Sequence, residues 1–155
     1  MKKPGLIFVV FAIALVMIIQ SCGREGGNST NVSQTGGTSS HKTGQNCMNC
    51  HCSGGEGSGW FNAAGTVYTA DSSSTYANVV VKLYTAPDSL GNQVLVTTIN
   101  GDAKGNFYTT ASINFGSGLY PVVVGAHGTK YMTATITQGA CNGCHGVTTG
   151  RLYTN

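Results

Sequence analysis

One five-residue pattern occurs twice in this chain and constrains it more than any other feature. The two copies are Cys47-Met48-Asn49-Cys50-His51 and Cys141-Asn142-Gly143-Cys144-His145, in a sequence with 6 Cys and 4 His. Two thiols at this spacing can each form a thioether with one vinyl group of a haem, and the following His then binds the iron. The pattern predicts two haem c groups, held by Cys47, Cys50, Cys141 and Cys144, with His51 and His145 as proximal iron ligands.

Paired cysteines also have other uses, which stay open at this point. Two Cys-x-x-Cys pairs can form a four-cysteine zinc site, two small disulfides or a redox dithiol. None of these requires a His after the second Cys, and here a His follows both times. A zinc ribbon also keeps its pairs about 15–20 residues apart, whereas these pairs lie far apart in the chain. The motifs therefore favour haem over zinc or disulfides.

At these two pentapeptides the sequence resembles the multihaem c-type cytochromes, and the resemblance covers nothing else. It implies electron transfer by a protein that is not an enzyme. One alternative is a dihaem enzyme of the peroxidase or reductase type, which needs an open iron site and nearby acid–base groups that the sequence does not display. Another is an adhesive or structural β module with zinc or disulfides at its cysteine pairs.

The first residues have the features of an export signal. Lys2 and Lys3 precede an uncharged apolar run over residues 6–19, which has the length of a signal-peptide core. Ser21-Cys22 after this run resembles a bacterial lipobox. The resemblance implies cleavage after residue 21 and lipid on Cys22, with an ordinary signal peptide or an uncleaved anchor as the alternatives. We expect an exported lipoprotein of the outer membrane or cell surface, or an extracellular protein.

The charge balance argues against nucleic-acid binding. Removal of Lys2 and Lys3 lowers the Lys and Arg count from 8 to 6 against 5 acidic residues, which leaves a net charge of +1. No basic run is present, so a nucleic-acid partner is not expected. The expected partners are redox proteins, other copies of the chain in a homopolymer, and a membrane reached through the lipid at Cys22.

Composition divides the exported chain into two parts. Residues 22–46 are rich in Gly, Ser, Thr, Asn and Gln, which predicts a flexible linker. Residues 47–155 form the dihaem domain. Short runs rich in Val, Thr and Tyr, separated by Gly, Asn, Asp and Ser, predict an all-β fold with strands over residues 65–69, 79–84, 94–99, 106–110, 119–126 and 130–136.

The middle of the chain resembles a carboxypeptidase regulatory-like domain. The resemblance rests on Gly65-Thr66-Val67 and on residues 77–83, 97–107 and 118–124, where turn glycines are prominent. It implies a small antiparallel β-sandwich, transthyretin-like or Ig-like, flanked by the two haem-binding loops. It also implies a scaffold without catalytic residues.

Two histidines outside the motifs are candidates for distal iron ligands. Two haem irons need two distal ligands, and His41 and His127 supply that number, with Met132 as a competitor. We expect His127 to pair within its own chain. His41, on the linker, is the candidate to reach a neighbouring copy and so to build a haem filament.

Cys52 is left over after these assignments. It is either a buried, inert thiol or a partner in an intermolecular bond.

Overall fold

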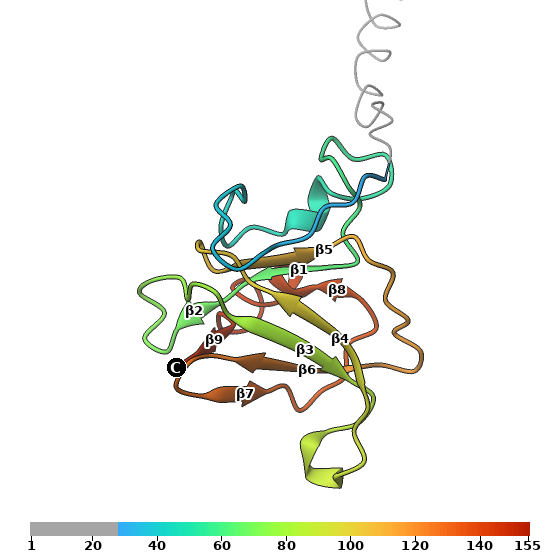
Figure 1. The fold of residues 1–155 in the computed structure, drawn as a ribbon, viewed down its shortest axis with the longest axis vertical. Coiled ribbons are helices and arrows are strands. Elements are labelled where there is room, and N and C mark those ends of the chain that lie inside the picture. The colour runs from blue at the N-terminus through green and yellow to red at the C-terminus, as the bar shows by residue number, and fades with distance from the viewer. Residues whose placement is uncertain (1–27) are drawn as a thin grey trace, which may run out of the picture.

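Most of the segments rich in Val, Thr and Tyr form strands, and the protein is a small all-β fold (Figure 1). The structure, a computed structural model, describes residues 28–155. Three 3-10 turns in this part are η2 (Cys47–Asn49), η3 (Asp88–Leu90) and η4 (Cys141–Gly143). The strands are β1 (Ala63–Thr66), β2 (Tyr68–Thr69), β3 (Val80–Tyr84), β4 (Leu95–Asn100), β5 (Asn106–Thr109), β6 (Tyr120–Val124), β7 (Thr129–Tyr131), β8 (Gly139–Ala140) and β9 (Tyr153–Thr154).

The strands belong to three sheets. An antiparallel four-stranded sheet has the order β4-β3-β6-β7, a three-stranded sheet has the order β5-β1-β8, and β2 pairs with β9. β8 runs parallel to β1, and β9 runs parallel to β2. The prediction of a purely antiparallel fold was therefore wrong at these two pairs. β8 and β9 have two residues each, which is too short to produce an alternation in the sequence.

Side chains from the two larger sheets share one hydrophobic core. Val81 and Leu83 of β3 and Phe107 of β5 are each at most 2% exposed and belong to one cluster. Val79 is also buried, while the intervening Val80 and Lys82 are partly exposed. This confirms the predicted alternation along residues 79–83, which comes from the two-residue period of a strand.

Phe107→Ala is expected to be among the most destabilising core truncations. Replacing a buried Phe with Ala costs about 3–5 kcal/mol, because contacts are lost and a cavity remains. The control is Leu90→Ala, since Leu90 is 64% exposed and such changes usually stay within about 0.5 kcal/mol. Urea unfolding measures both variants. Equal midpoints would contradict the position of Phe107 in the core.

Residues 28–46 lie against the three-stranded sheet, which differs from the prediction of a flexible linker (blue in Figure 1). Val32 forms a β-bridge with Thr109, and the amide of Ser33 donates to the Tyr108 carbonyl at 2.9 Å. Ser33 and Ser40 are buried. Hydrogen bonds made by small polar residues order this segment. The linker prediction rested on the low apolar content of the segment and did not include these bonds.

Candidate functional site

The two Cys-x-x-Cys-His motifs have the same local conformation, although their variable residues differ. η2 covers the first three residues of one motif and η4 those of the other. The amide of His51 donates to the Cys47 carbonyl, and the amide of His145 donates to the Cys141 carbonyl, both at 2.9 Å. In each motif, one turn of backbone thus brings the His back beside the first Cys.

The surroundings of His51 determine which of its ring nitrogens is free. Nδ1 lies 3.0 Å from the Ser58 carbonyl and 3.2 Å from the Gly59 carbonyl. A carbonyl only accepts hydrogen bonds, so Nδ1 carries the proton and the Nε2 lone pair is available to a metal. The ring also stacks on Phe61, with centroids 4.1 Å apart. A Cβ on Gly57 would lie 2.7 Å from the imidazole, so this packing needs glycine there.

His145 repeats this arrangement at the second motif. Its Nδ1 lies 2.9 Å from the Gly150 carbonyl. The same reasoning assigns the proton to Nδ1 and leaves Nε2 free. His51 is buried whereas His145 is half-buried. Both motif histidines therefore have the tautomer that a proximal iron ligand requires.

A cavity of about 550 Å³ opens beside the first motif. This volume is in the range of small-molecule and cofactor sites. Residues 39–42 and 56–58 border it, and so do the aromatic residues Phe61 and Tyr108, the latter in β5. The lining side chains that matter most for chemistry are His41, Cys47, Cys50, His51, Phe61 and Tyr108.

His41 and His51 lie near each other along this cavity. Their ring centroids are 5.8 Å apart, and the ring planes are tilted by 38°. Metal–imidazole bonds are about 2 Å long, so two rings on opposite sides of one ion have centroids about 6 Å apart. The two imidazoles are therefore close enough to each other to be candidate ligands of one metal ion. The sequence favoured His41 as a ligand for a neighbouring copy, whereas here it lies beside His51 of its own chain.

Several residues of this cavity were not found from the sequence. Phe61 and Tyr108 stack at 4.9 Å and supply an apolar wall. Lys42 and Glu56 bring opposite charges to the rim. The carbonyls that orient the two imidazoles belong to residues 58, 59 and 150, and a backbone group leaves no signal in the residue types.

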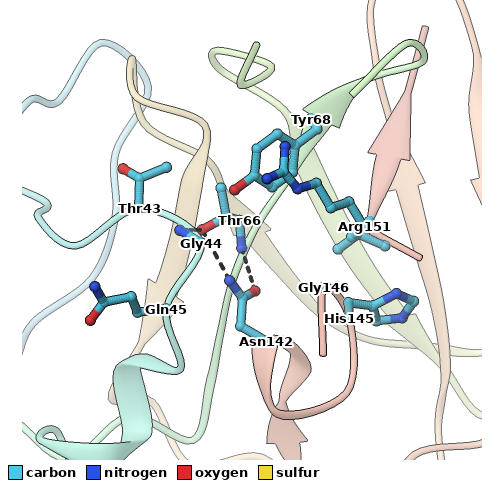
Figure 2. A pocket seen from close by; sticks show the side chains of 10 residues that line it. Thr43, Gly44, Gln45, Thr66, Tyr68, Asn142, His145, Gly146 and Arg151 are labelled. Atoms are coloured by element: carbon cyan, nitrogen blue, oxygen red, sulfur yellow. Dashed lines mark hydrogen bonds between the residues drawn. The ribbon is translucent and has the colours of Figure 1, made fainter. Parts of the chain in front are cut away.

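The second motif packs against the core and borders a smaller cavity of about 190 Å³ (Figure 2). His145, Arg151 and Tyr68 line this cavity together with residues 43–45. The Arg151 guanidinium lies 4.5 Å from the centroid of the Tyr68 ring, in a cation–π contact. Nη1 of Arg151 also donates to the Ser72 carbonyl at 2.9 Å, so the side chain brings a positive charge to the wall of this cavity.

The two motifs are close to each other in space. Both η2 and η4 contact β1. A Cβ on Gly143 of the second motif would lie 3.5 Å from Nδ2 of Asn46, which precedes the first motif. The nine strands thus bring together two motifs that are separated by about ninety residues of sequence.

Burial perturbs the first cysteine of each motif. Burial raises the pKa of Cys141 to about 12, from an ordinary value of 9.0, and also raises the pKa of Cys47. Cys144 is exposed. All five described cysteines are free thiols.

Thiol labelling of haem-free protein should therefore discriminate within the second motif. At pH 8 we expect maleimide to modify Cys141 at least about a hundredfold more slowly than Cys144, because only the thiolate reacts. Peptide mass spectrometry measures both rates. The folded-state pKa of Cys141 lies above its unfolded value, so this group's stabilisation is complete below pH 9 and is lost as the pH rises towards 12. Equal rates at pH 8 would contradict the burial of Cys141.

Cys52 remains outside both cavities and is half-buried. Within residues 28–155, no group of three or more His, Cys, Asp or Glu side chains is arranged to hold a metal ion. A four-cysteine zinc site would need its thiols to converge on one point, and the described thiols do not form such a group.

His127 is not brought to either motif. It lies in the exposed turn between β6 and β7, where its amide donates to the Asn155 carbonyl at 3.0 Å. It lines neither of the two cavities. Met132 follows β7, and its amide donates to the Pro121 carbonyl. The expected pairing of His127 with the second motif of its own chain is therefore not seen.

The predicted signal and the lipid-bearing Cys22 lie outside the described residues. Across residues 28–155 the structure contains no helix with the length and apolar character needed to cross a membrane.

Comparison with known proteins adds no assignment. No family model, no curated protein and no solved structure matches this chain.

Proposed function

We propose that this chain is an electron carrier with two covalently bound haem c groups. The observation that carries the proposal is the His41–His51 pair, whose centroids lie 5.8 Å apart beside a cavity that Cys47 and Cys50 also line. One cavity thus has two thiols for attachment and two imidazoles at a spacing that suits one iron.

The residues of the chain have distinct roles in this proposal. The thiols of each motif anchor the group, and His51 and His145 bind through Nε2, because a backbone carbonyl holds the proton on Nδ1. Phe61 and Tyr108 exclude water from one side of the first cavity. The haem iron supplies the one-electron redox centre. Ligation by two His gives a lower potential than ligation by His and Met.

The close approach of the two motifs supports electron transfer within one chain. Asn46 and Gly143, next to and within the motifs, are near neighbours. The strands form the scaffold that holds the two motifs close together. We also propose that this scaffold is a transthyretin-like β-sandwich. We also propose an exported protein, anchored through lipid on Cys22 at the outer membrane or cell surface.

The test is to produce the full chain, with its signal, in cells that attach haem c. Pyridine haemochrome quantitation should give two haems per chain, and intact mass should confirm covalent attachment. A reduced-minus-oxidised spectrum should display both groups as redox-active. A colourless protein of bare polypeptide mass contradicts the proposal and favours a β module with zinc or disulfides.

In this proposal the haem at the second motif takes its distal ligand from a neighbouring copy of the chain. His127 is exposed and is therefore available for that role. Ligation between copies would join haems into a chain that extends through a homopolymer, with each copy giving His127 and receiving another. This arrangement favours His127, rather than His41, as the ligand that crosses.

His127→Ala is expected to abolish assembly of the copies while both haems stay attached. The reason is that the variant loses the ligand that links one copy to the next. Sedimentation and negative-stain microscopy measure assembly, and haemochrome quantitation controls for haem loading. Lys130→Ala, in the neighbouring strand β7, is the matched control. Assembly of His127→Ala equal to that of the unchanged chain would rule out this role.

A further inference from the structure

A buried amide holds the segment that carries His41. Asn106, the first residue of β5, is 2% exposed. Its Nδ2 donates to Oγ of Ser40 at 2.8 Å and to Oγ1 of Thr43 at 3.0 Å. Its Oδ1 accepts from Oγ1 of Thr66 at 2.6 Å. Both N–H groups of this side-chain amide and its oxygen therefore have a hydrogen-bond partner.

The two hydroxyls bound by Asn106 lie on either side of His41. Ser40 directly precedes His41, and Thr43 is two residues after it. One side chain thus fixes both ends of a four-residue segment. Further bonds fix its backbone: Nζ of Lys104 donates to the Ser40 carbonyl at 2.6 Å, and the Gly44 amide donates to Oγ1 of Thr66 at 2.9 Å.

The same network continues to the second motif. Oγ1 of Thr66 also accepts from Nδ2 of Asn142 at 3.3 Å, and Oδ1 of Asn142 accepts from the Thr66 amide at 2.8 Å (Figure 2). Asn142 lies between the two cysteines of that motif. The Thr66 hydroxyl therefore donates once and accepts twice, which uses its full capacity. The donor directions agree along the whole path from Asn142 to Ser40.

The side chain of Asn106 is not needed for the turn that precedes β5, so its hydrogen bonds serve the segment around His41. The Asn106 amide N–H donates to Oδ1 of Asp102 at 3.0 Å, and this bond closes the turn before β5 without the Asn106 side chain. The side chain is committed to Thr66 and to the segment around His41. Removing this side chain would leave the hydroxyls of Ser40 and Thr43 without their partner. A polar group that loses its buried partner is destabilising until it reaches water, so the segment around His41 would no longer be held in place.

We infer that Asn106 is a positioning residue that holds His41 towards His51, and that Thr66 and Asn142 tie this segment to the second motif. The inference rests on the proposed haem-binding function for its ligation readout. Asn106 borders the cavity, but it acts through His41, since its polar atoms are used by the network.

The test uses two separate variants, Asn106→Ala and Thr43→Val. Thr43→Val is the milder change, because it removes the hydroxyl and keeps the side-chain volume. In holoprotein lacking the thiols of the second motif (Cys141→Ala with Cys144→Ala), we expect both changes to let carbon monoxide bind the reduced protein, where the parent does not bind it. In haem-free protein, hydrogen exchange of the Gly44 and Gln45 amides, which donate to Oγ1 of Thr66 and to the Lys42 carbonyl, should accelerate about tenfold, as expected for the loss of one or two hydrogen bonds.

Thr110→Val is the matched control. Oγ1 of Thr110 accepts from the Asn31 amide at 2.9 Å, so it anchors the same N-terminal segment far from His41. Exchange at the Gly44 and Gln45 amides and carbon monoxide binding should stay at the parent level in this variant. Parent-like behaviour of both Asn106→Ala and Thr43→Val, or an equal effect of Thr110→Val, overturns the inference. A parent without haem defeats the proposed function instead, and the exchange experiment still decides the role of Asn106.

Discussion

Replacing Cys47 and Cys50 together with Ala is expected to lower the haem content from two groups per chain to one. The thioether bonds to these thiols are what retain the first haem, since an unattached haem is held by axial ligation alone. Replacing Cys141 and Cys144 together should remove the other haem. Haemochrome quantitation and intact mass measure both outcomes, and the variant that lacks all four thiols should carry none.

Cys52→Ala is the matched control for this experiment. Cys52 immediately follows His51, yet it lines neither cavity. Its replacement should leave two haems per chain. Two haems after the loss of either thiol pair, or one haem after Cys52→Ala, would contradict the assignment of the motifs. Zinc bound at the paired thiols would instead give a colourless chain in every variant.

The fold could be predicted where strands are long enough to repeat their pattern. Residues 79–84 alternate between core and surface, and they become β3 with a difference of one residue. Residues 65–69 were expected as one strand, but the chain divides at Val67 into β1 and β2. Val67 is completely buried, its amide donates to the Gly105 carbonyl next to β5, and its carbonyl accepts from the Tyr76 amide, whereas β2 beyond it pairs with β9. Tertiary contacts of this kind are not encoded in local residue types.

The candidate site was predictable in its chemistry and less so in its geometry. Cysteine spacing identified the two motifs, and counting the histidines identified His41. The position of His41 beside His51 depends on buried polar contacts of Ser40 and Thr43. Such contacts join residues more than sixty positions apart, so composition alone assigned this segment to a flexible linker.

His41→Ala is the second change with a large expected effect, because it removes one of two imidazoles from the first cavity. We expect the reduced variant to bind carbon monoxide at that site, in the chain from which Cys141 and Cys144 have been removed. Visible spectra should also change from a six-coordinate to a five-coordinate form. Added imidazole should restore the parent spectrum, since it can occupy the space left by the side chain.

His127→Ala in the same single-haem chain separates this role from a general effect of losing a histidine. It should leave the spectrum unchanged, because His127 lies in an exposed turn and outside the first cavity. His41→Met gives a further check, since a thioether ligand raises the reduction potential relative to imidazole. A six-coordinate spectrum that survives His41→Ala without added imidazole would contradict ligation by His41. The 5.8 Å separation from His51 would then reflect packing alone.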